Sequence, residues 1–406
     1  MRLLFSKLIT VTVIFIGISF NSLLAQEKLE GYLTDVATNQ PVSYAHLGIR
    51  GKSRTISNEE GYFRIDPTGI LNSDTLVITH INYVSIDLSI KSFRQQINKK
   101  IRLKENIIEL KEIRVKVTED FQAFEDIVKQ TKKSLSFPIT TTIYYRELVR
   151  ENKSFNKFAD GLLTVVYEKN EDQDNIEVKV DQCRVEKLPK DDDDQFEMIS
   201  PVKIESVLGH TYVNFLNKFR NEKQINYHFY AFNDSSTLGG RIMIIEPKKE
   251  ADRSDNQLLF RATIKADQNN IIKEALIEMD SLSHYEKSLL GLKMEFVKTQ
   301  VLLSFKEERG INYLAFARIN YILRMTTKKF AQLEDFVSEF VVLDLMPGAK
   351  DIERGDIYKR NSLYKKGNKY ESPFWKGSNI PIFTAEEERL LGELENKRKT
   401  TEALAK

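Results

Sequence analysis

The residue patterns that support metal or nucleophilic catalysis are missing from this chain. A zinc peptidase needs a His-x-x-Glu pair, a distant histidine and a catalytic glutamate. None of the five histidines is followed by glutamate three residues later: His46, His80, His210, His228 and His284. We therefore expect no catalytic residue, no metal and no cofactor, and we interpret the chain as a non-enzymatic protein. An unrecognised hydrolase stays as an alternative, because a polar cleft is not visible in a sequence.

The most concentrated charge is an acidic run, Asp191–Asp194. Several carboxylates close together are the ligands that calcium prefers. The run lacks the alternating spacing and the turn glycine of a calcium-binding loop, and it lies between Pro189 and Phe196 in an expected connector. We interpret it as a solvated loop, with calcium binding as the alternative.

Two short motifs are candidate binding residues. The first motif is Tyr145, Arg146 and Glu147, in which the Arg146 guanidinium could bind an acidic group of a ligand. The alternative is an Arg/Glu surface pair on a strand whose aromatic neighbours enter the core. The second motif is Phe374 and Trp375. These side chains could stack on a sugar, or they could pack the C-terminal segment of the chain against the rest of the protein.

Charge excludes one class of partner. The chain has 406 residues, with 61 Lys+Arg and 59 Asp+Glu. Arg2 and Lys7 account for the whole excess, so a chain that begins after residue 25 is formally neutral. Bulk electrostatic attraction to nucleic acid is therefore not expected.

The first 25 residues have the layout of a secretory signal. Arg2 and Lys7 precede an apolar run from Leu8 to Phe20, and Ala25 ends a small-residue site before Gln26. The alternative, an uncleaved anchor, is disfavoured because the run is shorter than the roughly 20 residues that cross a bilayer. We expect an exported protein of the periplasm, or of the periplasmic face of the outer membrane, with no transmembrane segment after cleavage.

Short alternating runs separated by turn residues predict an antiparallel β-sandwich over residues 26–117. Its motifs are Gly31 to Asp35, Gln40 to Leu47 and Thr55 to Phe63. In the last motif, Asn58 to Gly61 predicts a turn in which glycine supplies a positive φ. These motifs resemble the carboxypeptidase-regulatory-like domain, an accessory domain that implies a β-sandwich and nothing catalytic.

From residue 118 to 383 the pattern predicts a large curved antiparallel sheet packed with two helices, and analogy with carrier proteins suggests that this sheet forms a half-barrel. The helices are expected at residues 118–136 and 202–220, from apolar spacings of three and four. In the strand from Leu292 to Phe305 the apolar parity shifts near Val297, which predicts a bulge or a strand buried on both faces. Residues 384–406 predict a surface helix that frays at its end.

The second domain also resembles the β-rich C-terminal region of outer-membrane-associated proteins of Bacteroidetes-type bacteria, through Tyr144 to Glu147 and Phe374-Trp375. In those proteins the function of this region is unknown. Our leading hypothesis is a binding or accessory role in the envelope, with an envelope protein, a glycan or a lipid as partner. A second hypothesis is an acyl-chain carrier, which predicts an apolar cavity under the helix at residues 202–220.

Overall fold

The computed structural model describes residues 29–49, 51–106, 117–152, 154–169, 174–187, 204–208, 216–217, 219–220, 226–234, 240–249, 258–281, 283, 285–289, 291–359, 362–366, 383–389, 391–393 and 396. The expected export signal, the acidic run Asp191–Asp194 and the pair Phe374 and Trp375 lie outside the described residues. Among the described residues, the fold is mainly β with few helices, as the sequence predicts.

The N-terminal unit consists of two small sheets around an apolar core. One sheet has the order β4-β1-β7 and the other has the order β3-β2-β5-β6. The strands are β1 (Leu29–Asp35), β2 (His46–Ile49), β3 (Ser53–Ile56), β4 (Tyr62–Ile65), β5 (Thr75–His80), β6 (Tyr83–Ser89) and β7 (Lys100–Leu103). Leu33, Leu47, Phe63 and Leu76 are fully buried between the sheets.

Two details of this sandwich differ from the expectation. Strands β1 and β7 pair in parallel, whereas the sequence predicts only antiparallel pairs. Strand β6 ends at Ser89, and the Ser89 side chain accepts a hydrogen bond from Ser92 N that caps a short helix, α2 (Ile90–Gln95), where the sequence predicts only strands and turns. Ile90 and Phe93 of this helix enter the sandwich core, so tertiary burial overrides the β-like local pattern.

The turn at Asn58 to Gly61 is built as its residues predict. The Asn58 side-chain oxygen accepts hydrogen bonds from Glu60 N at 3.0 Å and Tyr62 N at 2.9 Å. Gly61 has a φ of 73°, and a Cβ there would lie 2.4 Å from the carbonyl oxygen of Leu33. Glycine is therefore required both by the backbone angle and by the close approach of β1.

Gly61→Ala should lower the free energy of unfolding by about 3 kcal/mol or more, because it adds a clash to the left-handed strain. Gly69 is the matched control, since it has a φ of 70° and open space around its Cβ position. Gly69→Ala should cost only about 1 kcal/mol. Urea unfolding measures both, and equal losses would contradict the close-approach argument.

The second unit is one open antiparallel sheet of 11 strands. Its order is β10-β9-β8-β18-β17-β16-β14-β13-β12-β11, and β15 pairs with β16. The strands are β8 (Ile139–Glu151), β9 (Ser154–Lys169), β10 (Asp174–Lys187), β11 (Tyr227–Asn233), β12 (Arg241–Pro247), β13 (Phe260–Ala266), β14 (Ile272–Met279), β15 (Glu286–Leu289), β16 (Leu292–Glu308), β17 (Ile311–Thr326) and β18 (Ala331–Pro347). The pairing of β8 with β18 joins the first and last of these strands in the middle of the sheet.

A β-bulge occurs where the sequence parity predicts it. The pairing of β16 with β17 shifts its register between Phe296 and Lys298, so Val297 is the extra residue. The shift turns the apolar side chains of β16 from one face of the sheet to the other.

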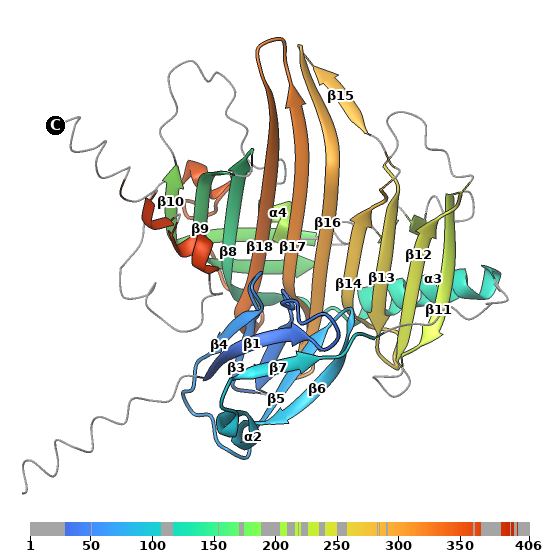
Figure 1. Cartoon of the computed structure of the whole chain (residues 1–406), viewed down its shortest axis with the longest axis vertical. Helices are drawn as coiled ribbons and strands as arrows, with labels where there is room; N and C mark the ends of the chain where they lie inside the picture. The colour runs from blue at the N-terminus through green and yellow to red at the C-terminus, as the bar shows by residue number, and fades with distance from the viewer. Residues whose placement is uncertain are drawn as a thin grey trace, which may run out of the picture.

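Helices cover one face of the sheet. Helix α3 (Val117–Ser134) contacts β11 and β14, and helix α4 (Ile204–Leu208) contacts β10, β17 and β18. Phe124 and Ile127 of α3 and Val207 of α4 belong to the large apolar core on this face. Figure 1 shows both helices behind the sheet. Among the described residues, no helix is both long and apolar enough to cross a membrane.

The sandwich lies on the opposite face of the sheet. Figure 1 shows it in front of the lower end of the central strands. Ile56 of the sandwich packs against Phe316 of β17 and Val341 of β18, with Tyr44 and Leu302 beside them. Phe383 and Leu391 near the C-terminus also contact this face, where they pack with Leu148, Phe158 and Val337. We call the side of α3 and α4 the helix face and the side of the sandwich the junction face.

Candidate functional site

The structure separates the residues of the predicted Tyr145-Arg146-Glu147 site. Successive side chains of a strand point to opposite faces. Tyr145 and Glu147 therefore lie on the helix face, whereas Arg146 lies on the junction face. Arg146 is 3% exposed and Glu147 is 1% exposed, so the surface-pair alternative is wrong. The three residues do not line a common pocket.

Glu147 holds a segment of the chain against the helix face. Its carboxyl group accepts hydrogen bonds from Tyr145 Oη at 3.0 Å and from Ser362 Oγ. Tyr364 Oη donates to the backbone oxygen of Glu147 at 3.2 Å. Burial raises the pKa of Glu147 from 4.5 to about 7, although the hydrogen bonds from Ser362 and Tyr145 favour the charged form.

Glu147 should make stability fall as pH rises. The folded protein favours the neutral acid, so its contribution is complete below the unfolded pKa of 4.5 and is lost as pH rises through about 7. The shift corresponds to about 3 kcal/mol. Glu147→Gln should therefore gain stability relative to the unmodified chain between pH 5 and pH 8. Urea unfolding of both proteins at each pH measures this difference, and a constant difference would contradict the assignment.

On the junction face, Arg146 belongs to a buried network of arginines and carboxylates. Arg146 Nε lies 2.5 Å from Glu339 Oε1, and its Nη1 lies 3.4 Å from Glu387 Oε2. Arg318 donates to Glu339 and, at 2.8 Å, to Glu59 of the sandwich turn. The network therefore joins the sandwich, the sheet and the C-terminal segment.

Charge pairing outweighs burial for the carboxylates of this network. Burial alone would raise the pKa of Glu339, but Arg146 and Arg318 together hold it below its usual value. Burial likewise opposes ionisation of Glu59, and Arg318 and a hydrogen bond from Tyr44 lower its pKa. Both groups are therefore ionised at neutral pH, which is the condition for a stabilising buried pair.

The start of the expected C-terminal surface helix takes part in this network through its buried Thr384 and Glu387, whereas Arg389 and Glu393 are exposed. Thr384 and Glu387 form a capping box: Thr384 N donates to Glu387 Oε2 at 2.9 Å and Glu387 N donates to Thr384 Oγ1 at 3.0 Å. Glu387 is 2% exposed, and the Phe383 ring lies 5.4 Å from the guanidinium carbon of Arg146. The start of this helix is therefore anchored by residues that its own weak apolar stripe does not reveal.

Arg146→Met should cost about 3–5 kcal/mol, because it leaves Glu339 and Glu387 buried with fewer positive partners. Arg389→Met is the matched control: Arg389 pairs with Glu393 one helical turn away and is 60% exposed. The control should cost less than about 0.5 kcal/mol. Urea unfolding at pH 7 measures both changes, and similar losses would show that the network contributes little.

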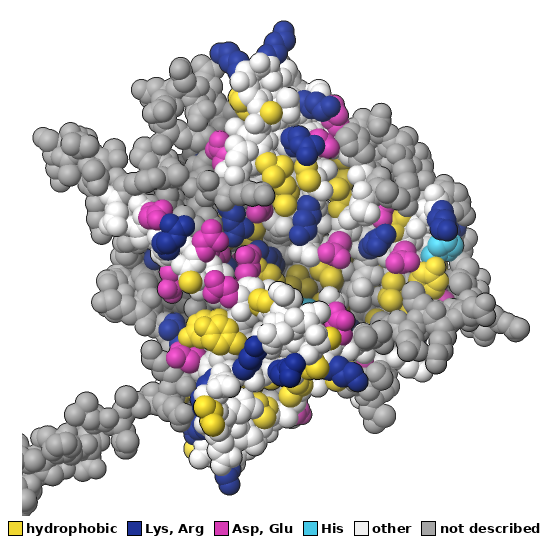
Figure 2. All heavy atoms as spheres, in the orientation of Figure 1, with side chains coloured by type: hydrophobic (Ala, Val, Ile, Leu, Met, Phe, Trp, Pro, Cys, Tyr) yellow, Lys and Arg dark blue, Asp and Glu magenta, His cyan; other side chains and the backbone are white. Residues whose placement is uncertain are grey.

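A half-open cleft lies between the sandwich and the large sheet. Its volume is about 720 Å³. One wall is the outer face of β2, β3 and β5, where the strand registers place His46, Gly48, Arg54, Ile56, Val77 and Thr79 on the same side. The other wall comes from β16, β17 and β18, with Lys306, Ala315 and Val341. Figure 2 shows the hollow between the two units, with hydrophobic side chains at its floor.

Polar contacts at two sides of the cleft keep its walls in place. Arg54 of β3 donates to Tyr313 Oη and to Glu308 of the sheet. Lys265 of β13 donates to the backbone oxygens of His80 at 3.0 Å and Tyr83 at 3.1 Å. The sandwich is therefore held on several strands of the sheet.

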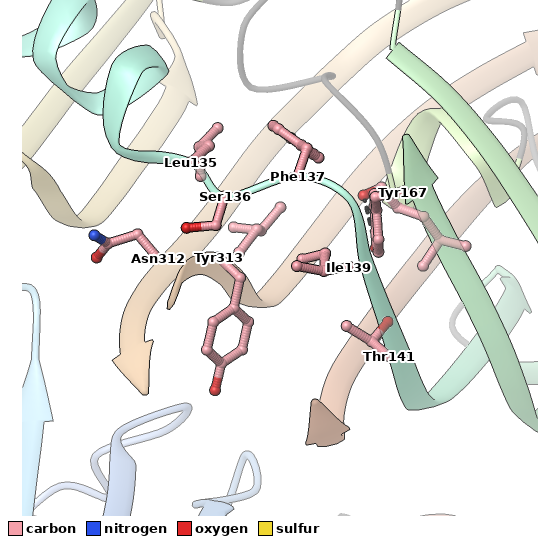
Figure 3. Close-up of a pocket in the computed structure, with 10 residues that line it drawn as sticks. Leu135, Ser136, Phe137, Ile139, Thr141, Tyr167, Asn312 and Tyr313 are labelled. Atoms are coloured by element: carbon pink, nitrogen blue, oxygen red, sulfur yellow. Dashed lines mark hydrogen bonds between the residues drawn. The ribbon is translucent and has the colours of Figure 1, made fainter. Parts of the chain in front are cut away.

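On the helix face, a small cavity lies beside the described part of α4, near the place that the acyl-carrier hypothesis predicts. It has a volume of about 30 Å³ and lies beside Leu208, the last described residue of α4. Figure 3 shows Phe137, Ile139 and Tyr167 around it. That volume is close to the share of one water molecule in the liquid. This cavity by itself is therefore too small for an acyl chain.

Sequence reasoning missed the cleft and most of the network. Arg318 and Glu339 each interrupt an apolar strand, and a charged residue in such a run predicts a buried partner. That signal could have found both residues but not their partners. No group of three or more His, Cys, Asp or Glu side chains that could hold a metal occurs among the described residues.

Comparisons with known proteins give no family for the chain. No protein-family model and no curated protein matches it. Among solved structures, a structure of lipid–protein interactions in lipovitellin aligns at 10% identity with a TM-score of 0.24. The alignment covers 62% of this chain and 30% of the lipovitellin chain. A score this low relates neither the folds nor the functions of the two proteins. Because no family model matches, the resemblance to the carboxypeptidase-regulatory-like domain stays a prediction.

Proposed function

We propose that the protein is a non-enzymatic binding protein of the bacterial envelope, exported to the periplasm, and that it holds its ligand in the cleft between the sandwich and the large sheet. The observation that carries this proposal is the cleft itself. Its volume of about 720 Å³ falls within the range of small-molecule sites, roughly 300–1,000 Å³. Because two units form it, the docking of the sandwich sets its shape.

The lining of the cleft supports binding more than catalysis. His46 is its only described residue of the type that most often acts as a general base. Burial lowers the pKa of His46 well below its usual value, and nearby Lys306 and His80 lower it further. Within the described part of the chain, no carboxylate or hydroxyl group forms a hydrogen bond with His46 that would orient it for proton transfer.

Lipid carriage is the second candidate function. Its support is the apolar cavity at Leu208, which lies where the hypothesis places it but has a volume of only about 30 Å³. The larger and more polar cleft on the junction face is the better candidate for a ligand site.

A substitution that fills the cleft tests the proposed function. Gly48 lies on the cleft wall, and the nearest atoms to a Cβ there are Arg54 Cβ and Ser53 O, both at 3.9 Å. Gly48→Phe should therefore fold and occupy the cleft. Gly355 has open space around its Cβ position, so Gly355→Phe is the matched control.

All three full-length proteins should be isolated from envelope extracts and examined by native mass spectrometry. We expect a small molecule to remain bound to the unmodified chain and to Gly355→Phe, and to be absent from Gly48→Phe. The same bound molecule on all three would place the ligand elsewhere, and a bound lipid on all three would favour the carrier. No bound molecule on any of them would contradict the proposal.

A further inference from the structure

One charged side chain in the cleft has little compensation from its neighbours. The ammonium group of Lys306 donates one hydrogen bond, to Thr79 Oγ1 at a long 3.4 Å, and has no ion pair within 4 Å among the described residues. An ammonium group has three donors. Most of the hydrogen-bonding capacity of Lys306 is therefore available to a molecule in the cleft.

The other charges of the cleft do not take up this capacity. Arg54 is paired with Glu308, so these two charges cancel within the cleft. Arg309 and Glu307 are exposed at its rim and also have opposite signs. Lys306 is the remaining charge, which makes the interior of the cleft positive.

The negative charge of Glu274, on β14, acts on Lys306. Burial lowers the pKa of Lys306; Glu274 opposes this change, whereas the positive charges of Arg54 and Lys273 add to it. Glu274 does not line the cleft, and its buried Oε1 has no hydrogen-bond partner among the described residues. Glu274 thus favours the charged form of Lys306 without occupying the donors that face the cleft.

His46 adds a second polar group, on the opposite wall of the cleft. Its ring packs edge-on against Phe316, with 5.2 Å between the ring centroids. A neutral imidazole offers one N–H donor and one acceptor. His46 and Thr79 are directly paired across β2 and β5, which brings the imidazole and the Lys306 ammonium to one end of the cleft.

Apolar side chains from both walls lie beside these polar groups. They belong to Ile56, Val77, Ala315 and Val341. A complementary ligand has one negative end and a short apolar body, because apolar walls favour apolar surface and an ammonium group favours an anion.

We infer that the cleft binds organic carboxylates, with the carboxylate on Lys306 and His46 and the apolar body against Ile56 and Val341. This inference rests on the proposed function, which supplies the site. The carboxylate could come from a short fatty acid or from the C-terminal end of a peptide, and both have the same chemistry at Lys306.

Calorimetric titration at pH 7 of the full chain tests this inference with four probes. Hexanoate represents a fatty acid and N-acetyl-leucine represents a peptide end. Hexanol and hexylamine are the neutral and cationic counterparts of hexanoate. We expect one or both carboxylates to bind, and hexanol and hexylamine to bind at least ten-fold more weakly.

Lys306→Met should weaken carboxylate binding at least ten-fold, whereas Lys328→Met, at an exposed turn, should leave it unchanged. Equal melting temperatures of the two variants would show that both fold. Equal binding of hexanol and hexanoate, or unchanged affinity in Lys306→Met, would overturn the carboxylate inference. If Gly48→Phe abolishes hexanol binding in that case, the cleft remains the ligand site. Absence of binding by every probe would overturn the inference as well.

Discussion

The meeting of the sandwich, the large sheet and the C-terminal segment depends on the buried pairing of Arg146 and Arg318 with carboxylates. Desolvation of these charges is costly, and the cost is offset only while each guanidinium keeps its partners. Glu339 lies between the two arginines on the sheet, Glu59 comes from the sandwich and Glu387 from the tail. Three distant segments must therefore meet at one place on the sheet. Together with the contacts of Arg54, Lys265 and Ile56, this requirement sets the position of the sandwich and with it the cleft.

The two faces of the large sheet are used in different ways. The helix face is a continuous apolar core that α3 and α4 cover, and Glu147 is an exceptional buried acid on it. The junction face alternates apolar contacts, such as Phe316 with Ile56, with charged groups. An apolar face buries well against amphipathic helices, whereas a mixed face leaves polar groups that need partners. The cleft lies on the mixed face, which is why cationic and apolar side chains line it together.

Local features were predictable from the sequence. The helix at 118–136 appears as Val117–Ser134, the parity shift at Val297 is a bulge, and Gly61 supplies the expected positive φ. Each depends on residues within a few positions of one another. The parallel pairing of β1 with β7 and the short helix α2 were not predictable, because both are decided by burial against the other sheet of the sandwich.

The sequence by itself determined the class of fold, since the periods of 2 and 3.6 are consequences of backbone geometry. It also pointed to Arg146 and Glu147 as unusual residues in an aromatic strand. Only the tertiary structure decided that these neighbours face opposite sides, and that Arg318 meets Glu59 across 259 positions of the chain. A charge pair depends on a distance in space. When two segments are far apart in the sequence, no local pattern of residues encodes the distance between them in the folded protein. The cleft, formed by two separately patterned units, is subject to the same limit.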